Sequence, residues 1–171
     1  YSRGGQFEPY NRYLRELSFD SNQSTLRRGH AAHERAHLLS AEGRHDEAVE
    51  SVKVATQLSP EIVDLRAVIK RARRAQAWAA LDHLLSLQLN TTRSVKKQQA
   101  ILVAQAKTRR ARGLEAAAYL ALMGARHLGE SEEAERALRE QLLEAEARAQ
   151  ITQWLLRDEV MARPSWRADL F

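Results

Sequence analysis

The chain has 171 residues and carries 27 Lys and Arg against 22 Asp and Glu, which gives a net charge of +5 at pH 7. It contains no cysteine, so disulfide bonds and thiolate metal sites are excluded. Ala, Leu, Arg and Glu dominate, with only seven Gly and three Pro, and this composition favours an all-α fold. Apolar runs such as Ala100–Ala104 are far shorter than the roughly 18 residues of a membrane span, so we expect no transmembrane segment.

The charge is distributed unevenly along the chain. Residues 1–60 are balanced, residues 61–112 hold twelve Lys and Arg against three Asp and Glu, and residues 113–171 hold seven against eleven. The sequence therefore predicts a basic middle and an acidic C-terminal part. The chain opens at Tyr1 without Met, which we interpret as a processed form or an excised domain.

By length the chain forms one domain with flanking segments. Residues 1–24 are expected to form a flexible lead-in and a short helix that begins at Pro9 and ends near Leu17, because proline fits the first turn of a helix. The main helical domain is expected over residues 25–162, and residues 163–171 form a tail.

The clearest pattern is a helix hairpin centred on Gly43. A helix capped by Ser24 or Thr25 is expected to end near Glu42, because glycine adopts the left-handed conformation of a helix C-cap at little cost. A second helix is predicted over Asp46–Leu58. Small and apolar residues line the inner face of the hairpin, namely Ala32, Ala36, Leu39, Ala48, Val52, Ala55 and Leu58.

Residues 29–62 resemble one tetratricopeptide repeat (TPR), a helix–turn–helix unit of about 34 residues. The matching positions are Ala36, Gly43, Ala48, Val52, Ala55, Leu58 and Pro60. A degenerate copy is expected near residues 115–148, where Gly129 and Ala134 repeat the spacing of Gly43 and Ala48. The resemblance implies an all-α fold of antiparallel helix hairpins, TPR-like or α-solenoid-like, with long irregular helices.

The helices after the first hairpin are predicted from breaks in the pattern. Residues 61–89 contain neither Gly nor Pro, and a kink or a fresh helix is expected near Trp78. Asn90–Thr92 is the next break, and Ser94 caps a helix that continues through Arg112.

The C-terminal part is predicted to contain two further helices. Gly113 is expected to interrupt the chain only weakly, because a lone glycine costs about 1 kcal/mol and need not end a helix. An Ala- and Leu-rich helix is expected over Glu115–His127 and stops at Gly129. Ser131 then caps a long acidic helix that lasts to about Met161.

Three histidines, His30, His33 and His37, are spaced to lie on one helical face. The TPR resemblance implies that they line a concave groove that binds a protein partner, together with Arg71 and Arg74 of the following helix. Histidine titrates near neutral pH, so such a groove would make binding pH-sensitive. The alternatives are a solvated polar stripe and adventitious metal binding.

Residues 33–37 read HERAH, which fits the H-E-x-x-H helix of zinc peptidases. On that template His33 and His37 bind zinc and Glu34 activates water. The metzincin extension is absent, and Glu61 is the one conceivable third ligand that we find. Because no strand is predicted to shape a substrate cleft, we interpret the motif as coincidental. The sequence therefore predicts no enzyme, no metal and no cofactor.

Two clusters of basic residues are compact enough to contact phosphates. They are Lys70, Arg71, Arg73 and Arg74, and Lys107, Arg109, Arg110 and Arg112. Adjacent residues on a helix point about 100° apart, so each cluster is expected to wrap around its helix. One interpretation is a solvated face, or a face paired with acidic residues in the fold or across a homodimer, namely Glu132, Glu133, Glu140 and Glu144. The others are contact with nucleic acid or an anionic lipid surface, and contact with an acidic protein.

Trp154, Trp166 and Phe171 are expected to join the core and a tucked terminus, or to dock a partner. Taken together, the sequence predicts a non-enzymatic protein-interaction module or scaffold of a multiprotein assembly. The resemblance implies assemblies such as bacterial secretion, pilus or surface-polysaccharide machinery, in the cytoplasm or the periplasm. The alternatives are a structural subunit that contacts nucleic acid or acidic partners through the basic middle, and a zinc hydrolase.

Overall fold

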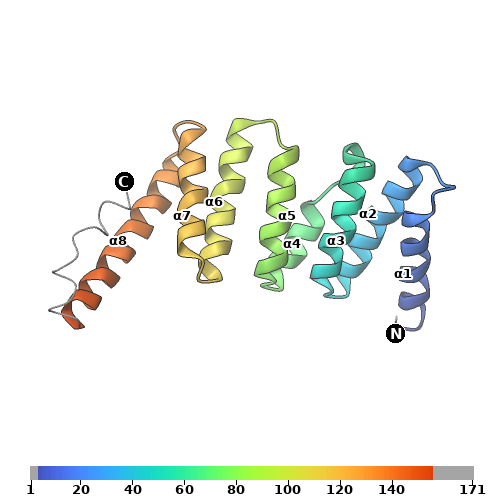
Figure 1. Cartoon of the computed structure of the whole chain (residues 1–171), viewed down its shortest axis with the longest axis horizontal. Helices are drawn as coiled ribbons and strands as arrows, with labels where there is room; N and C mark the ends of the chain where they lie inside the picture. The colour runs from blue at the N-terminus through green and yellow to red at the C-terminus, as the bar shows by residue number, and fades with distance from the viewer. Residues whose placement is uncertain (1–3, 156–171) are drawn as a thin grey trace.

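A computed structural model describes residues 4–155, apart from the side chains of residues 4–6, 147 and 150–155. The described residues form α-helices with one 3-10 turn and no strand, and the helices follow one another along the long axis of the molecule (Figure 1). In chain order these elements are α1 (Gly4–Phe19), α2 (Thr25–Ala41), α3 (His45–Leu58), η1 (Pro60–Ile62), α4 (Arg66–Arg74), α5 (Trp78–Thr91), α6 (Val95–Ala111), α7 (Glu115–His127) and α8 (Glu132–Leu155).

Three turns share one hydrogen-bonded geometry. Each contains a residue with positive φ, which is 80° at Gly43, 54° at Gln76 and 73° at Gly113. In each turn the N–H of the next residue donates to the carbonyl five residues earlier, at 2.9 to 3.0 Å, as in a Schellman motif. The following helix begins two residues after the positive-φ residue. The described fold is therefore a stack of three helix hairpins, α2–α3, α4–α5 and α6–α7, flanked by α1 and α8, and the predicted all-α, helical-repeat-like class is confirmed.

Two predicted boundaries are wrong. Helix α1 begins at Gly4, so Pro9 lies inside it and residues 4–8 are helical instead of a lead-in. Proline has no N–H group, so Pro9 cannot donate the helical hydrogen bond to the carbonyl oxygen of Gly5. So close to the start of the helix, this is the single hydrogen bond that is lost. Gly113 ends a helix outright, because its left-handed conformation closes the α6–α7 hairpin.

The degenerate copy expected near residues 115–148 forms a helix pair, α7 and α8, but with a different turn. Gly129 has a φ of 139°, and its N–H donates to the carbonyl of Arg126 at 3.1 Å. In the C-terminal part, the turn that matches Gly43 is the one at Gly113. The predicted end of α8 near Met161 and the aromatic residues Trp166 and Phe171 lie outside the described residues, as does the side chain of Trp154.

Small residues let the helices of each hairpin approach closely. Ala36, Ala48 and Ala55 are completely buried where α2 packs against α3. A Cβ atom placed on Gly29 would lie 2.7 Å from the Oγ atom of Ser59, so only glycine fits at that crossing. Two of the predicted caps are present, since Ser24 and Ser131 each accept a hydrogen bond from the N–H three residues later, at 3.3 Å. Ser94 stands at the start of α6, but its side chain makes no capping hydrogen bond.

Candidate functional site

The first helices of the hairpins, α2, α4 and α6, form a row that α8 extends. Helix α4 has nine residues, whereas α2 and α6 have 17 each. The chain before α4 instead forms the 3-10 turn Pro60–Ile62 and an extended residue, Val63. The row is therefore shortened in its middle, and its three interfaces (α2–α4, α4–α6 and α6–α8) are closed to different degrees.

Histidines close the α2–α4 interface. The Nε2 atom of His33 accepts a hydrogen bond from the backbone N–H of Asp64 at 3.2 Å, and it lies 3.2 Å from the Nε2 atom of His37. The guanidinium of Arg71 donates to the carbonyl oxygen of His37 at 3.2 Å. Burial, the neighbouring His33 and the Arg71 charge lower the pKa of His37 below its ordinary value. The surroundings of His37 therefore favour its neutral form, and both imidazoles lie between α2 and the start of α4.

The three histidines of the predicted groove thus have different surroundings. His30 is exposed, whereas His33 and His37 are half-buried. Arg71 contacts His37, whereas Arg74 lies in a cleft that none of the three histidines lines.

The HERAH residues make other contacts in the structure. Glu34 accepts a hydrogen bond from the hydroxyl of Tyr10, which ties α2 to α1. Within residues 4–155, as far as their side chains are described, no group of three or more His, Cys, Asp or Glu side chains could hold a metal ion.

Ion pairs cross the α6–α8 interface in the C-terminal half of α6. The ammonium of Lys107 lies 2.9 Å from the carboxylate of Glu133, and the guanidinium of Arg110 is paired with Glu144. The hydrogen bond from Arg110 lowers the pKa of Glu144. Pairing within the fold was one of the alternatives for the basic residues, and it is confirmed for these two.

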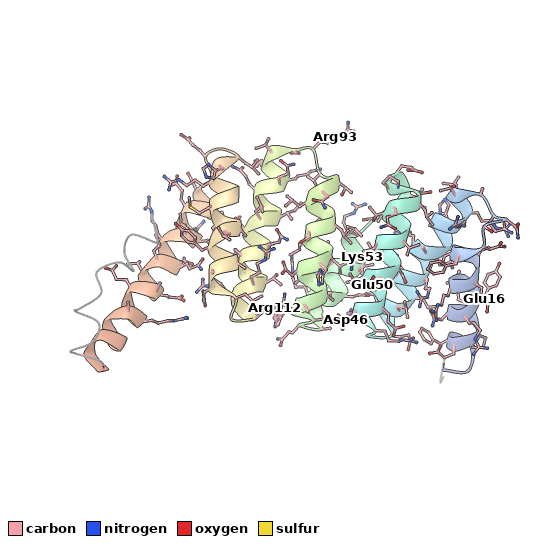
Figure 2. All side chains as sticks on the ribbon, viewed as in Figure 1. Glu16, Asp46, Glu50, Lys53, Arg93 and Arg112 are labelled. Atoms are coloured by element: carbon pink, nitrogen blue, oxygen red, sulfur yellow. The ribbon has the colours of Figure 1, made fainter. Side chains whose placement is uncertain are left out.

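Arg109 and Arg112 share a carboxylate that sequence reasoning missed. Asp82 of α5 lies 3.1 Å from Arg109 and 3.2 Å from Arg112, and its side chain is only 15% exposed. Arg112 directly follows the C-terminal end of α6, while Arg93 lies in the turn before its N-terminal end (Figure 2). Since Asp82 stands alone in a basic stretch of sequence, its spacing gave no sign that it neutralises residues about 30 positions later.

The α4–α6 interface remains open. It contains a cleft of about 580 Å³, which we call the α4–α6 cleft. Its lining residues come from three helices: Arg66, Ile69, Lys70, Arg73, Arg74, Leu85, Gln88, Ala100, Ile101 and Ala104. Ile69, Leu85 and Ile101 are buried and form an apolar floor.

Basic residues form one side of this cleft. Lys70, Arg73 and Arg74 are exposed, and none has a hydrogen bond or ion pair with a described residue. Arg66 is paired with Asp64, whose pKa it lowers to about 2 through hydrogen bonds from its side chain and its backbone N–H. Three of the four residues of the first basic cluster thus share one side of α4. Positions 70, 73 and 74 are spaced i, i+3, i+4 and share one face, while position 71 faces α2.

A second cleft, of about 690 Å³, lies on the other side of α6 and shares Ala100 with the first. We call it the α6–α8 cleft. Glu130, Glu132 and Glu133 line it beside Lys96. The two neighbouring clefts therefore carry charge of opposite sign.

No helix in the described part of the chain has the length and apolarity that a membrane crossing requires. Comparisons of the chain with protein-family models, with curated proteins and with solved structures find no match. The function must therefore be inferred from the arrangement of these interfaces.

Proposed function

We propose that the protein is a non-enzymatic interaction module that binds a segment of a partner protein in the α4–α6 cleft. One observation carries the proposal: an open cleft has a buried apolar floor beside three cationic side chains that no described residue neutralises. Concave apolar surfaces with a few polar groups at their edge are typical of binding sites.

The stacked hairpins support the same proposal. A row of short helix pairs presents an extended surface, and repeat proteins of this kind use such surfaces to bind other proteins. The resemblance of residues 29–62 to a tetratricopeptide repeat points in the same direction. It also motivates the proposal that the partner belongs to a multiprotein assembly in which this chain serves as a scaffold.

Nucleic acid is the second candidate partner, because residues 61–112 hold twelve Lys and Arg against only three Asp and Glu. Phosphate contacts need cations but no apolar floor, and single-stranded nucleic acid also favours aromatic side chains on which its bases stack. No aromatic residue lines the α4–α6 cleft. The floor of Ile69, Leu85 and Ile101 therefore favours a protein segment.

Site-specific photo-crosslinking in the cells that produce the protein tests the proposal. A photoreactive amino acid replaces Gln88, which lines the cleft, and in a matched control it replaces Gln57, which is exposed on α3. We expect a discrete protein adduct from position 88 and none from position 57. Equal labelling at both positions, or an adduct that nuclease removes, would contradict a protein-binding cleft.

A further inference from the structure

The α6–α8 interface shows how the molecule itself neutralises a basic first helix. Lys107 and Arg110 lie six and three residues before the positive-φ residue of their hairpin, and Lys70 and Arg73 lie at the same two positions of theirs. The two pairs are therefore equivalent in the repeated hairpin. Each pair projects from a first helix toward the next helix of the row.

The difference lies in what the next helix supplies. Helix α8 presents Glu133 to Lys107 and Glu144 to Arg110. Helix α6 presents to α4 only Ala100, Ile101 and Ala104, which carry no charge. The cationic edge of the α4–α6 cleft thus lacks the carboxylates that its counterpart receives from within the fold.

We infer that the segment bound in the α4–α6 cleft is acidic and carries a bulky apolar side chain, a conclusion that rests on the proposed function. The apolar side chain packs on Ile69, Leu85 and Ile101. Its neighbouring Asp or Glu residues pair with Lys70, Arg73 and Arg74, as the glutamates of α8 pair with α6. Charge complementarity of this kind selects partners and steers their approach.

The charge of the neighbouring α6–α8 cleft bears on which side of its apolar residue the partner carries its acidic residues. A segment that continues past Ala100 enters the α6–α8 cleft, where it meets Glu130 and Glu132. Like charges placed there would repel. The acidic residues of the partner therefore lie on the α4 side of its apolar residue, and neutral or basic residues lie on the other side.

Selection from a displayed library of random peptides on the full chain tests this inference. Binding of each selected peptide is then measured to the wild type and to two triple variants that remove equal charge. The first combines Lys70→Ala, Arg73→Ala and Arg74→Ala. The matched control combines Arg12→Ala, Arg93→Ala and Lys97→Ala, which changes three exposed cations that line neither cleft. Because all six side chains lack described partners, both variants should unfold at the wild-type temperature.

We expect peptides with Asp or Glu on one side of a Leu, Ile, Phe or Trp residue. Their affinity should fall at least tenfold in the first variant and less than threefold in the control. Peptides that depend on the cleft but lack acidic residues would overturn the inference and leave the proposed function standing. A complete lack of cleft-dependent peptides would count against both. Equal losses in the two variants, or equal binding of polyglutamate and of oligo(dT), would reduce the site to unspecific charge attraction and overturn the inference.

Discussion

The α6–α8 and α4–α6 interfaces start from the same basic chemistry, but among the described residues only the first is crossed by ion pairs. In the first, Lys107 and Arg110 are paired with Glu133 and Glu144 of the same chain. In the second, the equivalent residues of α4 border an open cleft without a described partner. A basic cluster is therefore informative about binding only when the carboxylates that face it are known.

The largest expected effect on stability comes from removing the carboxylate of Asp82, which neutralises Arg109 and Arg112 at the C-terminal end of α6. Asp82→Asn leaves Arg109 and Arg112 without their counter-charge at a site that is 15% exposed. Breaking a buried ion pair costs several kcal/mol, and for this largely buried one we expect a loss of about 2–4 kcal/mol. Urea unfolding checks it.

Glu16→Gln is the control for that measurement, because Glu16 is exposed on α1 and has no described partner (Figure 2). Its effect should stay within about 0.5 kcal/mol. If the two variants unfold alike, then Asp82 does not hold the α6 cluster and the contrast between the interfaces loses its basis.

A smaller effect is expected at the turns of the two hairpins that carry the basic clusters. Gln76 and Gly113 both have positive φ. In that conformation a residue with a Cβ atom is destabilised by roughly 1–2 kcal/mol relative to glycine. Gln76→Gly should therefore stabilise the protein by about 1 kcal/mol after the entropic cost of glycine, and Gly113→Ala should destabilise it by about the same amount. A Cβ at Gly113 meets no atom within 4 Å, so the second change reports backbone strain alone.

Thermal unfolding distinguishes these outcomes. Shifts of opposite sign would show that the α4–α5 and α6–α7 hairpins close with the same turn. Destabilisation by Gln76→Gly would mean that the Gln76 conformation is not strained, and the equivalence of the two clusters would fail with it.

A still smaller difference in stability is expected between variants of the two equivalent lysines, Lys107 and Lys70. Lys107→Ala removes an exposed ion pair, which is worth at most about 1 kcal/mol, whereas Lys70→Ala removes a side chain without a described partner. The first variant should unfold slightly more easily in low salt, and the difference should vanish at high ionic strength. Equal stability of the two variants in low salt would contradict the paired state of Lys107.

Local patterns predicted the helices well. The hairpin at Gly43, the fresh helix at Trp78 and the cap at Ser131 follow from residue preferences that act over a few positions. The turn at Gln76 was not recognised as a repeat of the one at Gly43, because the sequence carries no glycine there. Its left-handed backbone is imposed by packing of the hairpin, which overrides local preference.

The candidate site was predicted less well, since it depends on which helices face one another. The sequence identified four of the five basic residues of α4, all except Arg66, but it grouped Arg74 with histidines that do not line its cleft. The apolar floor and the carboxylate of Asp82 come from helices whose position follows from long-range packing. Spacing along one helix cannot predict such contacts.

The smallest effect concerns the α2–α4 interface, which contains His33, His37 and Arg71. Folding lowers the pKa of His37 through burial, the neighbouring His33 and the Arg71 charge, so the unfolded chain binds a proton more readily than the folded chain. The free energy of unfolding should therefore be constant near pH 8 and should decrease as the pH falls below about 6.5. His37→Gln should flatten this dependence, while His83→Gln, at an exposed position of α5, should preserve it. Thermal unfolding from pH 8 to pH 5 measures both slopes, and an unchanged slope in His37→Gln would show that the histidine pair does not hold this interface.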